Sequence, residues 1–278
     1  MSMAKMTGVV LIVAGALLAS ACGTTRSSRQ DTAQALDRVL SGDHRSVENK
    51  ARDKYRHPKE TLLFFGIRPE MSVVEVWPGA GWYTEVLAPL LRENGQYYAA
   101  HYAPNPESKS ITDGLQRYRD KLAARPDVYD KVQVTEMGQG SADIAPPGSV
   151  DMVLTFRNVH SWMGRGWAPE AFAKMYKALK PGGVLGVVEH RGAGGEQDPQ
   201  AKSGYVNEDY AIELIEDAGF KLVAKSEINA NPKDTKDYEQ GVWTLPPTYR
   251  LGEQDKEKYA AIGESDRFTL KFVKPRED

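Results

Sequence analysis

Short apolar runs alternate with amphipathic stretches along most of the chain. Runs rich in β-branched and aromatic residues predict strands, and apolar residues at i, i+3, i+4 and i+7 predict helices. The predicted strands span residues 73–76, 97–101, 131–136, 150–156, 184–189, 220–226 and 268–273. The predicted helices span residues 31–40, 46–65 with a break at Pro58, 83–92, 113–124, 172–179 and 207–218, the last with Asn207 as its cap.

Strands that alternate with helices form a mainly parallel sheet with helices on both faces. The sequence therefore predicts a doubly wound α/β domain. Residues 228–265 break the alternation between the last two predicted strands. A connection of this length is usually functional or disordered, and its aromatic residues Tyr238, Trp243 and Tyr249 argue against disorder.

The N-terminal segment has the pattern of a secretory signal. Lys5 precedes an apolar run over residues 6–21, which is too short for a membrane span. The run ends in Leu-Ala-Ser-Ala-Cys-Gly, which resembles a lipobox with Cys22 as the lipidated residue and alanine where leucine is usual. A free or buried thiol behind an ordinary cleaved signal is the alternative.

The lipobox resemblance sets the expected organisation of the chain. Residues 1–21 are the predicted signal peptide, and residues 22–45 are a tether that leads into the N-terminal helices. Residues 46–278 form the main domain, with the insert at 228–265. Because Gly23 follows Cys22 in place of an aspartate, the resemblance implies a lipid anchor in the outer membrane, facing the periplasm.

Composition limits the classes of partner. The 278 residues are 41% hydrophobic and 27% charged, and the formal net charge is −2, so no basic field points to nucleic acid. With a single cysteine the chain forms no internal disulfide, and its apolar core must stabilise the fold. The sequence carries no signal for an oligomeric state.

A glycine loop follows the first predicted strand. Residues 73–81 read Val-Val-Glu-Val-Trp-Pro-Gly-Ala-Gly and lead into a helix. Glycine allows a tight turn and the close approach of a ligand, and the helix N-terminus offers free N–H groups. In open α/β sheets, ligands bind beyond the carboxyl ends of the strands.

This loop resembles the first motif of the class I S-adenosylmethionine-dependent methyltransferases, acid-x-Gly-x-Gly-x-Gly. Glu75, Gly79 and Gly81 match the motif, and Trp77 stands at its first glycine. Short sequence matches to the same family at residues 149–153, 179–185 and 217–220 extend the resemblance over about residues 61–275. It implies a Rossmann-like sheet of seven strands with the last strand antiparallel, and it looks most like predicted small-molecule methyltransferases.

The resemblance also implies a cofactor site for S-adenosylmethionine. Gly79 and Gly81 would pass under its methionine part, and Glu75 would order the loop or reach the amino group. The second strand ends without the usual ribose-binding acid, so His101 is the substitute, and Asp143 is the nearest match to the acid that reaches adenine. The full predicted set is Glu75, Trp77, Gly79, Gly81, His101, Asp143, Arg157 and Asn158.

Histidines follow three predicted strands whose carboxyl ends face one crevice. Histidine there is a candidate acid, base or metal ligand. We predict His160 or His190 as the base for methyl transfer, with Glu189 beside them. The alternatives are structural histidines bonded to loop carbonyls, or a metal held by these three residues. No His-x-x-x-His pair supports the metal, so none is predicted.

The predicted substrate contacts surround the same crevice. Arg157 or Arg191 is placed to bind a carboxylate bidentately. Residues 231–249 are expected to form a lid, although a surface extension is the alternative. The predicted substrate residues are Arg191, Trp162, Trp243 and Tyr249. Tyr55, Arg56 and His57 are weaker candidates, because N-terminal helices often cover the cofactor in this family.

These observations favour methyl transfer from S-adenosylmethionine to a small molecule, by a lipoprotein anchored in the cell envelope. A non-catalytic protein that binds another ligand or a metal on the same fold is the second hypothesis. Trp77 and the missing ribose-binding acid favour it. An envelope interaction protein with an empty crevice is the third.

Overall fold

A seven-stranded sheet forms the centre of the protein. The structure, a computed structural model, describes residues 17–276, with residues 17–28 described by their backbone alone. The strand order is β3-β2-β1-β4-β5-β7-β6, and β7 is antiparallel to both of its neighbours. The strands are β1 Ser72–Val76, β2 Gln96–Tyr102, β3 Gln133–Met137, β4 Val150–Phe156, β5 Leu179–His190, β6 Lys221–Ser226 and β7 Arg267–Val273. The predicted doubly wound fold with an antiparallel last strand is confirmed.

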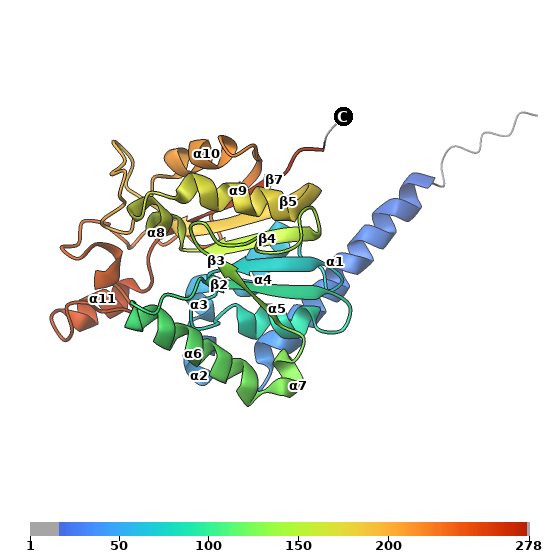
Figure 1. Ribbon diagram of the computed structural model, residues 1–278, viewed down its shortest axis with the longest axis horizontal. Helices are drawn as coiled ribbons and strands as arrows, with labels where there is room; N and C mark the ends of the chain where they lie inside the picture. Colours follow the sequence, from blue (N-terminus) through green and yellow to red (C-terminus); the bar gives the residue numbers. More distant parts are fainter. Residues whose placement is uncertain (1–16, 277–278) are drawn as a thin grey trace, which may run out of the picture.

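Helices cover both faces of this sheet (Figure 1). One face carries α1 Leu17–Ser41, α4 Pro58–Phe65, α5 Thr84–Leu91, α6 Lys109–Ala124 and α7 Pro126–Tyr129. The other carries α8 Val159–Gly164, α9 Ala168–Ala178 and α10 Glu208–Glu216. The short helices α2 Val47–Lys50 and α3 Asp53–Arg56 lie before α4, and the insert contains η1 Gly241–Thr244 and α11 Lys256–Ile262.

Each face buries its own apolar cluster. Phe172 and Met175 of α9 are fully buried against one side of the sheet, and Leu62 and Phe65 of α4 against the other. Burying a side chain as large as phenylalanine contributes roughly 2–3 kcal/mol. Gly186 of β5 permits this packing, because a Cβ there would lie 2.8 Å from the Phe65 ring.

The predicted tether is helical in the structure. α1 begins at Leu17 and includes Cys22, so residues 22–30 continue the helix predicted at 31–40. A packed segment nucleates a helix that then propagates at little cost, and buried Leu36 supplies such packing. Among residues 17–276, no helix combines the length and apolar character needed to span a bilayer. Residues 1–16 of the predicted signal lie outside the described part.

Asn207 does not cap its helix through its side chain. It precedes α10, but its Oδ1 accepts from the backbone N–H of Gly194 at 3.1 Å. Its Nδ2 donates to the carbonyl of Gly195 at 3.0 Å. The prediction of a side-chain cap is therefore wrong, because both polar atoms of this side chain form hydrogen bonds with the loop that follows β5.

Candidate functional site

The strand register brings the chemistry-bearing residues to one edge. Val76 pairs with Ala100 and with Thr155, and Phe156 pairs with Val188. The next residue of each strand or loop therefore lies at the same carboxyl edge. These residues are Trp77, His101, Arg157 and Glu189.

A cavity of about 340 Å³ opens at this edge. Its walls come from residues 49–56, the loop after β1, the loop after β4, and the insert together with the start of β7. Trp243 and Pro246 of the insert line it, so the insert borders the crevice. Hydrogen bonds from Asn231 Nδ2 to the carbonyls of Ile262 and Glu264, at 2.9 and 2.7 Å, join the two ends of the insert.

The backbone of Gly79 lines the cavity, and no side chain covers it. Its φ is +59°, a left-handed conformation that favours glycine, and no atom lies within 4 Å of where a Cβ would project. Gly81 also has a positive φ, but its Cβ position faces Tyr118 and Lys121 of α6. Gly79 therefore lines the cavity, whereas the predicted contact at Gly81 is replaced by helix packing.

Glu75 points away from the cavity. Its buried Oε2 accepts a hydrogen bond of 2.5 Å from the Tyr97 hydroxyl and one of 3.4 Å from Thr84. Burial raises the pKa of this carboxyl to about 7, although the two hydrogen bonds lower it. The side chain of Glu75 therefore joins β1 to Tyr97 of β2 and to Thr84 at the start of α5, and the two roles expected of it stay predictions.

Trp77 fills the space between the ends of β1 and β3. Its Nε1 donates a hydrogen bond of 2.8 Å to the carbonyl of Met137, and only 7% of the residue is exposed. The indole packs against the rings of Tyr102, Trp162 and Trp167. It stands between the main cavity and a second cavity of about 280 Å³ at the ends of β2 and β3, because Trp77 and Tyr102 line both.

His101 holds the glycine loop. Its Nδ1 accepts from the backbone N–H of Tyr102 at 2.8 Å, so Nε2 carries the proton and donates to the carbonyl of Gly79 at 3.0 Å. Burial lowers the pKa of this imidazole, although the bond to Gly79 raises it. His101 is 1% exposed and does not line the cavity, and its ribose contact stays a prediction.

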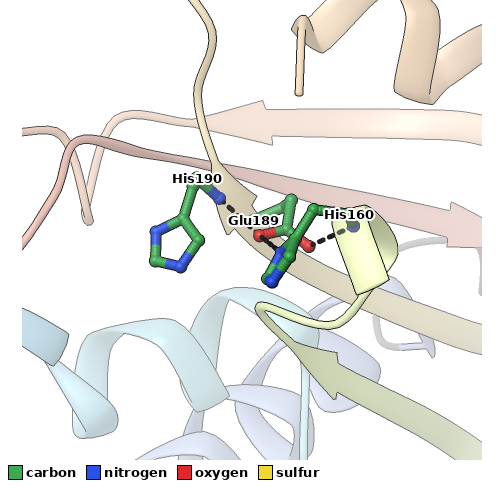
Figure 2. A group of neighbouring side chains, drawn as sticks. All are labelled: His160, Glu189 and His190. Carbon is green, nitrogen blue, oxygen red and sulfur yellow. Dashed lines mark hydrogen bonds and ion pairs between the residues drawn. The ribbon is translucent and has the colours of Figure 1, made fainter. Parts of the chain in front are cut away.

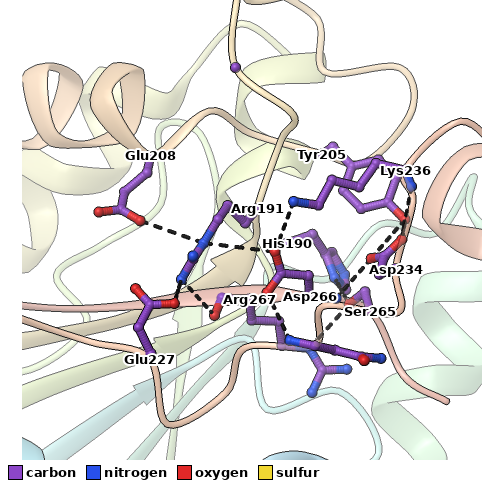
Figure 3. A network of polar contacts seen from close by, with 12 residues as sticks. His190, Arg191, Tyr205, Glu208, Glu227, Asp234, Lys236, Ser265, Asp266 and Arg267 are labelled. Atoms are coloured by element: carbon purple, nitrogen blue, oxygen red, sulfur yellow. Dashed lines mark hydrogen bonds and ion pairs between the residues drawn. The ribbon is translucent and has the colours of Figure 1, made fainter. Parts of the chain in front are cut away.

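Two other predicted site residues, Asp143 and Arg191, form ion pairs outside the cavity. Asp143 pairs with Lys177 of α9 at 2.8 Å and lines neither cavity. Arg191 pairs with Glu227 at 2.7 Å and with Glu208 at 3.5 Å. Figure 3 shows this arginine turned toward its acidic partners. The guanidinium of Arg191, which was predicted to bind substrate, is therefore ion-paired with neighbouring carboxylates.

Of the predicted aromatic substrate residues, one of three lines the cavity. Trp243 does so, whereas Trp162 is completely buried among Trp77, Trp167 and Phe172. Tyr249 is also outside the lining, beside Lys256 of α11. A sequence does not show which side of a loop faces inward, and these two side chains face other parts of the protein.

His160, Glu189 and His190 meet at the ends of β4 and β5 (Figure 2). The carboxylate of Glu189 is 0% exposed and accepts from Nδ1 of His160 at 3.1 Å. It also accepts from the backbone N–H groups of His160 and His190 at 3.3 and 2.8 Å. A proton on Nδ1 of His160 leaves Nε2 as the unprotonated nitrogen. His160 and His190 both line the cavity.

These three residues fit an acid–base group better than a metal centre. Their donor atoms lie within 4.8 Å of one another, as a metal site requires. Both oxygens of Glu189, however, already accept N–H groups. Burial holds the pKa of His190 well below its usual value, and the charges of Arg267, Arg157 and Arg56 add to this effect. The same positive field disfavours a bound cation.

Arg157 and Asn158 follow β4 and shape the cavity floor. Asn158 Nδ2 donates to the carbonyl of Val76 at 2.9 Å and to Thr155 Oγ1 at 3.1 Å, which joins β4 to β1. Arg157 has a φ of +63°, a conformation that costs a non-glycine residue on the order of 1 kcal/mol. Its backbone N–H donates to Val188 at 2.7 Å and keeps it there.

Three further arginines complete the cavity. Arg52, Arg56 and Arg267 line it together with Glu264. Arg56 was a weak candidate in the sequence, whereas the other three were not predicted. Arg52 and Arg56 are spaced i, i+4 in a helical stretch, which is the one local signal available. Glu264 and Arg267 lie more than 200 residues away, so no pattern connects them.

Known proteins of similar structure share this fold at low sequence identity. A methyltransferase from Aquifex aeolicus, described as S-adenosylmethionine-dependent, has a TM-score of 0.55 and 16% identity, over 81% of this chain and 93% of that one. The [4+2]-cyclase SpnF has a TM-score of 0.53 and 18% identity, over 85% and 86%. Haemonchus contortus phosphoethanolamine N-methyltransferase 2, in complex with S-adenosylmethionine, has a TM-score of 0.54 and 16% identity, over 80% and 53%.

The fold is that of the S-adenosylmethionine-dependent methyltransferases. The sequence itself matches no family model and no curated protein. One structure that shares the methyltransferase fold is described as a cyclase, so the fold does not fix the reaction. The residues of the cavity must carry the functional argument.

Proposed function

We propose that this protein transfers a methyl group from S-adenosylmethionine to a small molecule bound in the 340 Å³ cavity. One observation carries the proposal: His160 lines the cavity bordered by the glycine loop, and buried Glu189 accepts from its Nδ1. In its neutral form, a histidine held in this way presents an unprotonated Nε2 to a bound molecule. Such a nitrogen accepts the proton that an oxygen or nitrogen nucleophile loses on methylation.

The residues present fit the methyl donor in part. The bare backbone at Gly79 and Ala80, with Asn158 beside it, suits the amino-acid half of the molecule. The nucleoside half requires space at the ends of β2 and β3, where the indole of Trp77 now lies. We therefore expect Trp77 to leave the carbonyl of Met137 when the donor binds. When bound, the donor supplies a methyl group activated on a sulfonium.

The remaining residues prepare the acceptor. Glu189 fixes the orientation and tautomer of His160. Trp243 and Pro246 of the insert supply apolar walls that exclude water from the bound molecule. Asn158 keeps the ends of β1 and β4 at a constant separation.

Binding of S-adenosylhomocysteine to the purified protein tests the proposal. We expect it to raise the thermal unfolding midpoint, because a ligand that binds only the folded state stabilises it. Gly79→Val should abolish this shift. Gly148→Val is the matched control, since Gly148 also has a positive φ and nothing within 4 Å of its Cβ position. Equal binding by the wild type and both variants would remove the glycine loop from the proposal.

A non-catalytic ligand-binding protein is the second candidate function. The buried, hydrogen-bonded indole of Trp77 favours it. In that case neither S-adenosylmethionine nor S-adenosylhomocysteine should stabilise the protein, and Trp77→Gly should not restore binding. Small molecules retained through purification would then identify the ligand class.

We further propose a lipid anchor on Cys22, in the outer membrane and facing the periplasm. The lipobox-like residues 18–23 support this proposal. Cells that express the full chain with a labelled fatty acid should incorporate the label, and Cys22→Ala should abolish incorporation. Labelling of the variant at the wild-type level would contradict the anchor.

A further inference from the structure

Four arginines from distant parts of the chain converge on the cavity. Arg52 and Arg56 come from the N-terminal helices, Arg157 follows β4, and Arg267 begins β7. Arg56 and Arg267 are only 5% and 2% exposed. Buried guanidinium groups need compensating charge, because protein interiors solvate them poorly.

One carboxylate compensates three of these charges. Glu264 Oε1 accepts from Arg52 at 2.7 Å, and its Oε2 accepts from Arg56 at 3.0 Å and from Arg267 at 2.5 Å. Burial alone raises the pKa of Glu264, but the charges of Arg267, Arg56 and Arg52 bring it well below its usual value. Both of its oxygens are therefore engaged.

Arg157 has no such partner. Its guanidinium makes no hydrogen bond or ion pair with any residue between 17 and 276, although it lines the cavity. Burial, reinforced by the charge of Arg267, lowers its pKa to about 10, where it is still protonated at neutral pH. The backbone of Arg157 is also held in a left-handed conformation at this point.

The cavity therefore carries an excess of positive charge. Its lining holds four arginines and a single carboxylate, and His160 and His190 add hydrogen-bond donors or acceptors rather than negative charge. Glu189 lies behind His160, outside the lining. This field attracts an anion and repels ammonium groups and metal ions.

We propose that this arginine cluster binds a carboxylate or phosphate group of the molecule whose nucleophile faces His160. Guanidinium forks hold both oxyanions bidentately. The assignment of the ligand as a methyl acceptor rests on the proposed function. The assignment of an anion site rests on the charges alone. It predicts an acidic small molecule and excludes cationic amines as acceptors.

Anion binding by the purified protein tests the inference. Sodium phosphate and sodium acetate, at constant ionic strength, are compared with sodium chloride by thermal shift and calorimetry. We expect phosphate, acetate or both to stabilise the wild type above chloride, and the stronger of the two identifies the group. Arg157→Gln should weaken that binding at least tenfold. Arg117→Gln makes the same charge change on an exposed residue of α6 outside this cavity, and should bind as the wild type does.

Stability without added anion provides a second measurement. Because the guanidinium of Arg157 has no hydrogen bond or ion pair of its own, Arg157→Gln should be at least as stable as the wild type in chloride. A marked loss of stability, equal anion responses in both variants, or no response above chloride in the wild type would overturn the inference. Arg52→Gln tests the same site from the N-terminal side.

S-adenosylhomocysteine separates this inference from the proposed function. Binding of an anion through Arg157, with no binding of S-adenosylhomocysteine, leaves the anion site standing and removes methyl transfer. Binding of S-adenosylhomocysteine, with no anion binding, removes the arginine site and leaves methyl transfer.

Discussion

The indole N–H of Trp77 donates to the carbonyl oxygen of Met137 at 2.8 Å, from the loop after β1 to the end of β3. A glycine at position 77 would leave this space open. The side chain therefore closes the region where the strand ends of this fold face a ligand.

Trp77→Gly should raise the affinity for S-adenosylhomocysteine at least tenfold. The variant removes the need to displace the indole, and calorimetry measures the change. Removing a buried tryptophan costs roughly 3–5 kcal/mol of stability, so folding must be checked by circular dichroism. Trp77→Phe is the control, because it keeps a ring but loses the bond to Met137. Weaker binding by a folded Trp77→Gly variant would show that the indole contributes to the ligand surface.

Glu189→Gln should remove the preference of His160 for the tautomer with its proton on Nδ1. The carboxylate accepts three N–H groups on its two oxygens, whereas a neutral amide keeps the shape but has a single acceptor oxygen. We expect ¹⁵N spectra of the imidazole to show a proton fixed on Nδ1 in the wild type and a mixture of tautomers in the variant. The stability loss should be about 1–3 kcal/mol. Identical imidazole spectra would refute the orienting role of Glu189.

Glu75 should make the stability depend on pH. Burial raises its pKa to about 7 from the usual 4.5, so the folded state keeps a proton that the unfolded chain releases between these values. The free energy of unfolding from this group therefore falls as pH rises from 4.5 to 7, by about 3 kcal/mol. Glu75→Gln should remove this fall in denaturant titrations. Exposed Glu136→Gln is the control and should keep it.

Glu264→Gln should destabilise the protein strongly. It leaves Arg52, Arg56 and Arg267 without their common partner, and breaking a buried ion pair on one side costs about 3–5 kcal/mol. Urea denaturation measures the loss. Glu253→Gln, at an exposed carboxylate of the insert, should leave the midpoint unchanged. Added phosphate should not rescue the Glu264 variant, because an anion cannot replace both buried oxygens.

The sheet and the glycine loop could be predicted because their signals are local. The apolar run of residues 150–156 and the i, i+3, i+4, i+7 pattern of α9 each lie within one element. Side-chain direction depends on tertiary contacts instead. Residue spacing therefore placed His160 and Glu189 at the crevice, but it did not show that Arg191 turns to Glu208 and Glu227.

The assembly of the arginine cluster could not be predicted, for a different reason. Arg52 and Arg56 meet Glu264 across 212 and 208 residues, and no periodicity spans such a distance. Arg157 was predicted to face the crevice, as a contact for the cofactor or for a substrate carboxylate. Its distinguishing features are its left-handed φ and its lack of a partner in the described part of the chain, which only coordinates reveal.

The bonds of Glu264 to Arg52 and Arg56 also have a consequence for biosynthesis. Because residues near both ends of the chain supply the walls, a chain that is still being synthesised has no finished cavity. The protein gains its binding capacity in a single late step, when the C-terminal strand joins the sheet. A chain cut short before β7 should therefore be inert from the moment it is made.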